Sequence, residues 1–216
     1  LLEVHRELVR VNEIDQGMIY LQITRGAPND RDFAFPPEDT PQTIVLFTQN
    51  KPGLAETPAA KKGIKVISIA DQRWARRDIK TVQLLYPSLG KMMAKAAGCD
   101  DAWMVEDGAV TEGTSNNAYI VKGNTIITRD LGNEILHGIT RAAVLRFARE
   151  AQMNVEERSF TIAEAQAADE AFITSASTFV MPVVKIDGAA VGTGCVGPIA
   201  TRLREIYIDE SRKAAV

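Results

Sequence analysis

Apolar and polar residues follow two different periods along the chain, and these periods predict both helices and strands. Leu1, Val4, Leu8 and Val11 recur at helical spacing, so residues 1–10 are expected to form an amphipathic helix. Short apolar runs bounded by turn residues predict strands at residues 18–24, 43–48, 65–70, 102–106, 117–121, 125–128, 171–174 and 183–186. Helical spacing returns in four later segments, residues 84–98, 140–151, 162–168 and 198–214.

The connections between these segments indicate the fold class. Asp107-Gly108, Lys122-Gly123-Asn124 and Asp187-Gly188 are sequences that β-hairpin turns prefer. Strands and helices do not alternate strictly, and the chain contains neither a GxGxxG motif nor a Walker loop, which disfavours a doubly wound nucleotide-binding sheet. The pattern therefore predicts an α+β fold whose larger domain is barrel-like.

A composition shift suggests two domains. Residues 51–60 contain Lys51-Pro52-Gly53 and Pro58, which is typical of an exposed linker. Residues 1–50 are then expected to be the remnant of a small N-terminal α/β domain, and residues 61–216 the larger domain. Because no Met precedes the first helix and its pattern resembles the middle of a longer one, we expect the chain to be N-terminally truncated.

Composition excludes several classes of function. The 216 residues carry a net charge of −3 without a strongly basic block, so nucleic acid is not an expected partner. The two cysteines and two histidines are far apart, which argues against a metal site and a disulfide framework. No apolar run approaches the roughly 20 residues that span a bilayer, and no segment resembles a signal peptide. A cytoplasmic protein without a membrane segment is therefore expected.

Two charged residues lie where strand ends could face a ligand. Lys80 follows an apolar strand and lies near Arg73, Arg76 and Arg77. Like charge disfavours the ammonium form, which makes an amine nucleophilic, although a solvated surface lysine fits the same pattern. Glu112 follows the turn at residues 107–108 and precedes a strand. It is either a carboxylate that faces a ligand or an ordinary turn or cap residue.

Two further segments could bind an anion. Gly138, Ile139 and Thr140 open a helix, and the backbone N–H groups of a helix start together with a hydroxyl group attract phosphate. Thr140 fits equally well as an N-cap. Ser175 and Ser177 belong to a hydroxyl cluster at the end of an apolar strand, which is either a second phosphate contact or an ordinary turn. Taken singly, none of these segments decides the function.

Their order along the chain is more specific. The segments DIKT (78–81), VTEGTSNN (110–117), ILHGITR (135–141) and ITSAS (173–177) together resemble fold type IV pyridoxal-phosphate-dependent aminotransferases. That family comprises D-amino-acid transaminases, branched-chain aminotransferases and aminodeoxychorismate lyase. The resemblance implies pyridoxal 5'-phosphate as cofactor. It also implies that Lys80 is the Schiff-base lysine that moves the substrate proton, and that Glu112 is the acidic partner of the pyridine nitrogen.

The resemblance implies further cofactor contacts. The phosphate would be bound by two sets of residues, one at the helix start and one at the hydroxyl cluster: Gly138, Ile139 and Thr140, and Ser175, Ala176 and Ser177. Ala176 has no hydroxyl group, so only its N–H can contribute. Arg73 matches a residue near the cofactor's phenolic oxygen, and Leu136 matches one that packs against the ring.

Residues 26–36 resemble the loop by which D-amino-acid transaminases deliver an arginine to the substrate α-carboxylate across a dimer interface. Arg31 fits this role because a guanidinium binds a carboxylate bidentately, whereas Phe33 replaces the histidine that is usual two residues later. We therefore expect a homodimeric transaminase that moves an amino group from a D-amino acid to a 2-oxo acid. The alternatives are an L-branched-chain aminotransferase, an aminodeoxychorismate lyase, or a non-catalytic fragment that serves as an interaction module.

Overall fold

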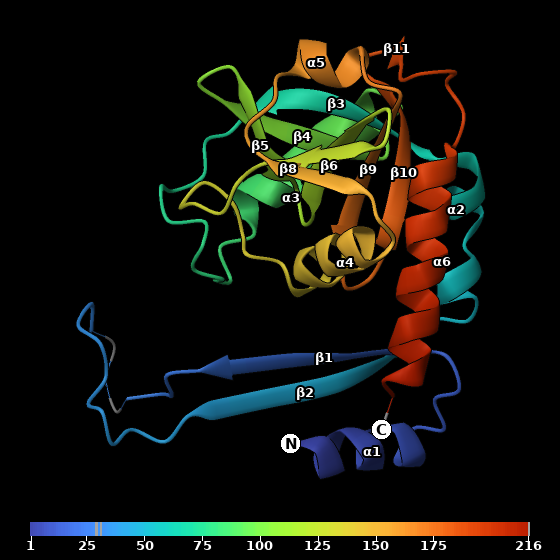
Figure 1. Cartoon of the computed structure of the whole chain (residues 1–216). Helices are drawn as coiled ribbons and strands as arrows, with labels where there is room; N and C mark the ends of the chain where they lie inside the picture. Colours follow the sequence, from blue (N-terminus) through green and yellow to red (C-terminus); the bar gives the residue numbers. More distant parts are fainter. Residues whose placement is uncertain (29, 31, 216) are drawn as a thin grey trace. The chain divides into compact units, whose positions relative to one another are not determined.

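The computed structural model describes residues 1–28, 30 and 32–215, which form two compact units, Leu1–Leu54 and Ala55–Val216 (Figure 1). Arg31, the predicted substrate residue, lies outside the described residues. The smaller unit contains helix α1 (Leu2–Val11) and strands β1 (Gly17–Thr24) and β2 (Thr43–Asn50). The two strands form an antiparallel ribbon in continuous register.

The larger unit is built on one mixed sheet. Its strands follow one another in the order β5-β4-β3-β10-β9-β6-β7-β8, and β11 pairs with β10. The pairs β3/β4, β3/β10 and β7/β8 are parallel, and the other pairs are antiparallel. The strands are β3 (Ile64–Ala70), β4 (Asp101–Glu106), β5 (Ala109–Gly113), β6 (Asn117–Lys122), β7 (Thr125–Thr128), β8 (Asn154–Glu157), β9 (Glu170–Ser175), β10 (Phe179–Ile186) and β11 (Ala189–Ala190).

The two ends of this sheet come close together, which gives the unit its barrel-like form. The backbone N–H of Val110, in the first strand of the order, donates to the carbonyl of Phe160 at 2.9 Å. Phe160 lies shortly after β8, the last strand of the order. The main chain thus bridges both edges of the sheet, and an edge that is covered is protected from pairing with another chain.

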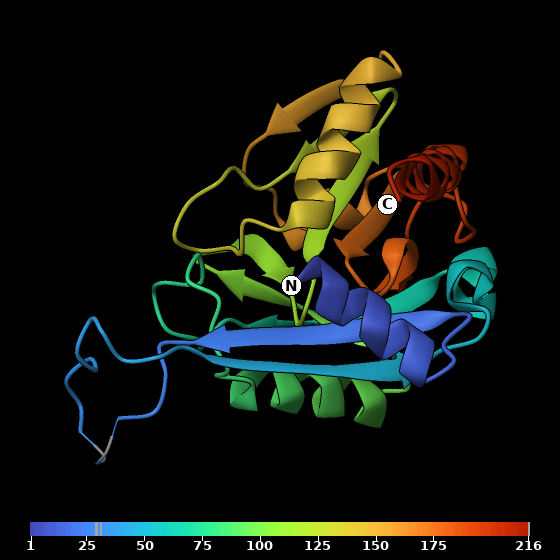
Figure 2. The ribbon, with the colours of Figure 1, turned by 90° about the horizontal axis from the view of Figure 1, so that it is seen from below.

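Helices cover the outside of the sheet. α3 (Leu85–Ala96) packs on β3 and β4, whereas α6 (Pro198–Lys213) packs on β9, β10 and helix α4 (Ile139–Glu150). Figure 2 shows α4 and α6 on one side of the larger unit and α3 on the other. The remaining helical segments are short: η1 (Leu54–Glu56), α2 (Pro58–Lys62) and α5 (Ile162–Gln166).

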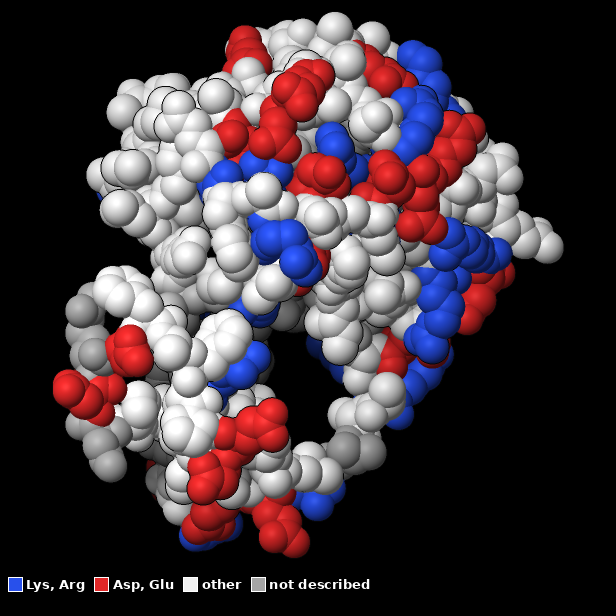
Figure 3. All heavy atoms as spheres, turned by 90° about the vertical axis from the view of Figure 1, so that its left-hand side faces the viewer, with Lys and Arg blue, Asp and Glu red and all other residues white. Residues whose placement is uncertain are grey.

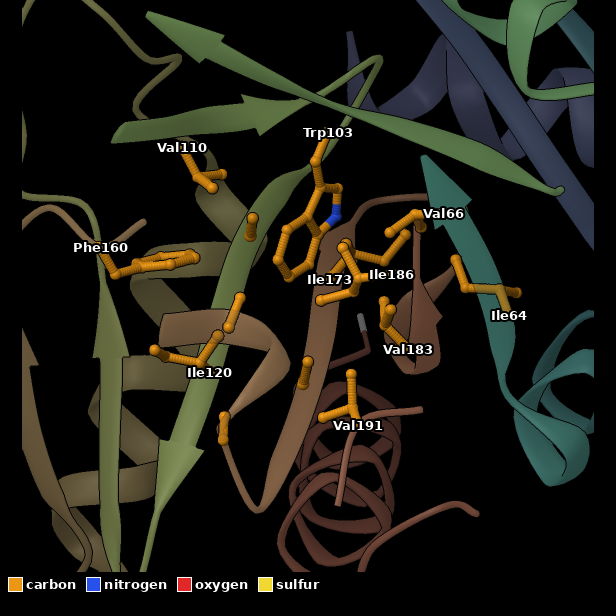
Figure 4. Packing of buried hydrophobic residues seen from close by; sticks show 14 of the residues in the cluster. Ile64, Val66, Trp103, Val110, Ile120, Phe160, Ile173, Val183, Ile186 and Val191 are labelled. Carbon is orange, nitrogen blue, oxygen red and sulfur yellow. The ribbon is translucent and has the colours of Figure 1, made fainter. Parts of the chain in front are cut away.

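The main hydrophobic core lies inside the curved sheet. Trp103 of β4 is fully buried and meets the edge of the Phe160 ring at a centroid distance of 6.0 Å. Val66, Ile173 and Ile186 come from three other strands and lie on one side of the indole ring (Figure 4). Because these positions draw on strands far apart in sequence, this core fixes the strand order that brings the polar strand ends together.

The structure confirms the predicted helices and strands within a few residues at their ends, and it adds η1, α2, β5, β8 and β11, which the pattern did not predict. Glu112 lies in strand β5, not in the loop that its polar neighbours suggested, because Thr111 and Glu112 are buried by polar partners. β10 begins at Phe179, earlier than the predicted start at residue 183. The first half was not predicted because it contains Pro182, and proline disfavours a strand. β8 was missed because its sequence is polar and it lies at the edge of the sheet.

Candidate functional site

The carboxylate of Glu112 is the centre of a buried polar cluster. Its Oε1 accepts from Arg73 Nη1 at 2.6 Å, and its Oε2 accepts from Asn117 Nδ2 and the Leu136 N–H, both at 3.1 Å. An ionised carboxylate accepts about four hydrogen bonds, so one position stays open on Oε1. Glu112 is 4% exposed, and burial raises its pKa while the charge of Arg73 offsets part of this rise.

A second carboxylate holds Arg73 in place. Asp71 accepts from Arg73 Nε at 2.9 Å and from Arg73 Nη2 at 2.6 Å, and Thr111 Oγ1 donates to it at 2.7 Å. Burial acts to raise the pKa of Asp71, but the hydrogen bonds and charge of Arg73 outweigh it and hold the pKa below its ordinary value. Arg73 thus shares one positive charge between two carboxylates, and Arg77 is a second cation beside Asp71, with its Nε 3.6 Å from Oδ2.

The start of helix α4 lies beside this cluster. Asn117 Nδ2 donates to the carbonyl of Leu136 at 2.9 Å as well as to Glu112. A Cβ added at Gly138, the residue before the helix, would lie 2.3 Å from Asn117 Oδ1. Glycine at this position therefore allows Asn117 to join the helix start to Glu112.

Thr140 in the first turn of α4 has an unusual hydroxyl group. The residue is 3% exposed, and its buried Oγ1 has no hydrogen-bond partner. The N-cap of α4 is Gly138, and no side chain caps the helix. The alternative role of Thr140 as an N-cap is thus wrong. A buried hydroxyl without a partner at a helix start is suited to an anion.

The predicted hydroxyl cluster forms a turn between β9 and β10. Ser175 Oγ lies 2.8 Å from Thr178 Oγ1 and 3.3 Å from Ser177 Oγ, and the side chains of Ala176 and Ser177 are exposed. Asn117 pairs with Thr174 across β6 and β9, so the turn begins next to the Glu112 cluster in the sheet register.

Lys80 lies on the irregular segment between β3 and α3, and it is exposed. Arg77 N–H, three residues earlier, donates to the Asn133 carbonyl at 2.8 Å, which places this segment beside the one that carries Leu136. Within the described residues no hydrogen bond or ion pair joins Lys80 to Glu112. Side-chain contacts thus connect Arg73, Glu112, Leu136 and Gly138. Lys80 and the turn at 175–178 are placed near this cluster only by backbone pairing of neighbouring residues, Arg77 with Asn133 and Asn117 with Thr174.

Asp71 was not predicted as a site residue. It directly follows the strand at 65–70, and this position was the only local signal for it. Asn117 belongs to the quoted segment 110–117, but its bridge between Glu112 and Leu136 depends on a contact across 19 positions.

Other site types receive no support from the described part of the chain. It contains no group of three or more His, Cys, Asp or Glu side chains that could hold a metal ion. None of its helices has the length and apolar character that crossing a membrane requires. Figure 3 shows acidic and basic side chains interspersed on one face.

Comparison with known proteins identifies the family. The sequence model of amino-transferase class IV matches residues 1–186. The chain belongs to this family. D-alanine aminotransferase from Bacillus licheniformis is 40% identical over 214 residues, which cover 96% of this aminotransferase and 74% of the relative. D-alanine aminotransferase from Staphylococcus aureus is 37% identical over 95% of this chain and 72% of its own.

Solved structures show the same fold. The branched-chain amino acid aminotransferase from Escherichia coli superposes with a TM-score of 0.84 at 24% identity, over 96% of this chain and 70% of its own. The enzyme from Thermobaculum terrenum in PLP-form has a TM-score of 0.79 at 25% identity, over 99% of this chain and 70% of its own. These structures confirm the predicted α+β, fold type IV class, and the sequence matches confirm the aminotransferase family.

Proposed function

We propose that this class IV aminotransferase moves an amino group from a D-amino acid to a 2-oxo acid and uses pyridoxal 5'-phosphate bound at Lys80. The observation that carries the proposal is the Glu112 cluster, a buried carboxylate with one open acceptor position beside a helix start. The D-alanine aminotransferases that are 40% and 37% identical support the choice of a D-amino acid as donor.

The residues fit the two polar ends of this cofactor. A protonated pyridine nitrogen needs a buried acceptor, which Oε1 of Glu112 provides. A phosphate needs donors, and the partnerless Thr140 Oγ1 at the start of α4 is one. When bound, pyridoxal phosphate supplies an electron sink for cleavage of the bond between the substrate Cα and its hydrogen.

Each residue then has a defined task. Lys80 Nζ would bind the cofactor through its aldehyde group and would accept and return the substrate proton. Glu112 would hold the proton on the ring nitrogen, and the charge of Arg73 favours its carboxylate form against burial, which raises its pKa. Leu136 would lie against the ring. The phosphate would be bound by the backbone and hydroxyl groups of Gly138, Ile139, Thr140, Ser175, Ala176 and Ser177, and Arg31 would bind the substrate carboxylate.

An absorbance titration tests the cofactor and the lysine. We expect pyridoxal phosphate to give a band near the visible range with the wild-type chain and with Lys185→Ala, an exposed lysine in β10. Free pyridoxal phosphate already absorbs there, so the diagnostic is the shift of the band when an amine attaches to the aldehyde. Lys80→Ala should bind the cofactor without this shift. The same shift in Lys80→Ala would refute the assignment of Lys80, and no change of the cofactor spectrum with the wild-type chain would refute the cofactor proposal.

The same spectra test the substrate. Addition of D-alanine should bleach the band as the amino group is transferred, and a 2-oxo acid should restore it. Bleaching by L-leucine alone would replace the proposal by the L-branched-chain reading, which the structural neighbours also represent. Bleaching by neither, with the band present, would favour a lyase or another donor.

The homodimer also belongs to this proposal. Gly90 and Ala94 face inward from α3, whereas Leu85, Leu89 and Met92 form an exposed stripe on the same helix. Exposed apolar stripes of this kind mark interaction surfaces. Leu89→Glu should lower the mass measured by light scattering from that of a dimer to that of a monomer, and Lys95→Glu on the same helix should not. A wild-type monomer would contradict the dimer.

A cytoplasmic location completes the proposal. Cys99 and Cys195 are both free thiols. Thiols persist in the reducing cytoplasm, whereas secreted proteins usually pair them. Cell fractionation with an antibody to the chain would test the location, and recovery of the protein outside the cytoplasmic fraction would contradict it.

A further inference from the structure

Arg204 of helix α6 is a buried cation that the proposed chemistry does not use. The residue is 8% exposed, and within the described part of the chain no carboxylate forms an ion pair with it. Burial lowers its pKa, but an arginine starts from so high a value that it stays protonated at neutral pH. Burial of a charge without an opposite charge costs free energy unless hydrogen bonds satisfy the charged group.

Among the residues that the structure describes, all hydrogen-bond partners of Arg204 are backbone carbonyl groups. Nη1 donates to the carbonyls of Thr178 and Val180, both at 2.7 Å, and Nη2 donates to the carbonyl of Ala55 at 2.9 Å. The guanidinium also lies over the ring of Phe179, 5.4 Å from its centroid. Arg204 thus binds the backbone of the residues before and after Phe179.

Phe179 is the point where the chain leaves the hydroxyl turn and enters β10. Its φ is +58°, a left-handed conformation that a residue with a bulky side chain rarely adopts. Such a conformation persists only where the surroundings fix it. The two carbonyls that flank Phe179 are those held by Arg204, so the guanidinium fixes the conformation that ends the turn.

The turn that ends there is Ser175–Thr178. Thr178 joins the two features, since its carbonyl accepts from Arg204 while its N–H donates to Ser175 Oγ at 3.2 Å. The geometry points to Arg204 as a positioning residue that holds the Ser175–Ser177 turn in shape for the phosphate group of the cofactor. This inference rests on the proposed function, which assigns the phosphate to that turn.

A ligand pair separates positioning of the phosphate turn from general stability. Pyridoxal 5'-phosphate and pyridoxal differ only in the phosphate group, so their dissociation constants for the full chain, measured by quenching of tryptophan fluorescence, isolate its contribution. Arg204→Met should raise the dissociation constant of pyridoxal phosphate about 30-fold and that of pyridoxal by less than about 3-fold. Arg202→Met, an exposed arginine on the same helix, should change neither constant.

Each outcome is decisive. If the wild-type chain binds both ligands equally, the phosphate site and this inference both fail. If the wild-type chain prefers pyridoxal phosphate but Arg204→Met keeps the same ratio of the two constants, the proposed function stands and the inference is overturned. Arg204→Lys keeps the charge but not the forked donors, and it should show the same selective loss to a smaller extent. It replaces Arg204→Met if that variant does not fold.

Discussion

Replacement of Asp71 by asparagine should destabilise the larger unit by about 3–5 kcal/mol. Asp71 accepts the Arg73 N–H and Arg73 Nε on Oδ1, and it accepts Arg73 Nη2 and Thr111 Oγ1 on Oδ2. An amide keeps one oxygen and places an NH₂ group at the position of the other. With NH₂ at the Oδ1 position, the two bonds from the Arg73 N–H and Nε are lost. With NH₂ at the Oδ2 position, the bond from Arg73 Nη2 is lost, whereas Thr111 Oγ1 can accept from the NH₂ and donate to the Met104 carbonyl. A charged bond of this kind contributes roughly 1.5–3 kcal/mol.

Asp78→Asn is the matched control for this prediction. Asp78 binds Arg76 through two hydrogen bonds of 2.9 and 2.7 Å, again two positions apart in sequence. The Arg76 side chain is half exposed, whereas Asp71 is fully buried. Exposed pairs contribute little because water screens them. Urea unfolding at pH 7, followed by the fluorescence of buried Trp103, should therefore show a large loss of stability for Asp71→Asn and a small change for Asp78→Asn.

The pH dependence has a fixed sign. The folded-state pKa of Asp71 lies below its ordinary value of 3.8, so its contribution is present above about pH 3.8 and is lost as pH falls through the lower folded value. The stability difference between wild type and Asp71→Asn should therefore shrink in acid. A difference that stays the same from pH 7 to pH 3, or one no larger than that of Asp78→Asn, would refute the charge-based reasoning.

Three further substitutions test the site and the core. Thr140→Val should leave the melting temperature without ligand unchanged or slightly higher, because it removes a buried hydroxyl without a partner. The same variant should raise the dissociation constant of pyridoxal phosphate about tenfold in the fluorescence titration. Gly138→Ala should lower the affinity as well, since its Cβ would displace Asn117. Phe160→Ala should cost about 3–5 kcal/mol in urea unfolding by leaving a cavity beside Trp103.

The sequence predicted the strands with apolar runs and missed β5 and β8, whose sequences are polar. β6 and β9 are apolar along most of their length, so the local pattern was sufficient. β5 contains Thr111 and Glu112, which are buried because Asp71 and Arg73, about 40 positions earlier, bind them. The pattern of neighbouring residues does not reveal a hydrogen-bond partner so far away in sequence. The segment therefore resembled a loop.

The candidate site divides in the same way. The start of α4 was predictable because Gly138, Ile139 and Thr140 are adjacent in sequence. The bridge by Asn117 was not, since it requires β6 and the segment before α4 to meet. Local motifs thus located the groups that could contact a ligand, while the structure was needed to show what holds them in position.

The charge of Glu112 shows why those supporting residues matter. Burial favours the neutral acid, whereas Arg73 favours the carboxylate. If Arg73 paired with Glu112 alone, the two charges would cancel and little negative charge would remain for a ring nitrogen. Asp71 takes two of the Arg73 side-chain donors and also lies 3.6 Å from Arg77 Nε, so the charge of Arg73 is not spent on Glu112 alone. The negative charge that Glu112 offers therefore depends on Arg73 and Asp71 as well as on Glu112 itself, and the motif VTEGTSNN contains only the last of the three.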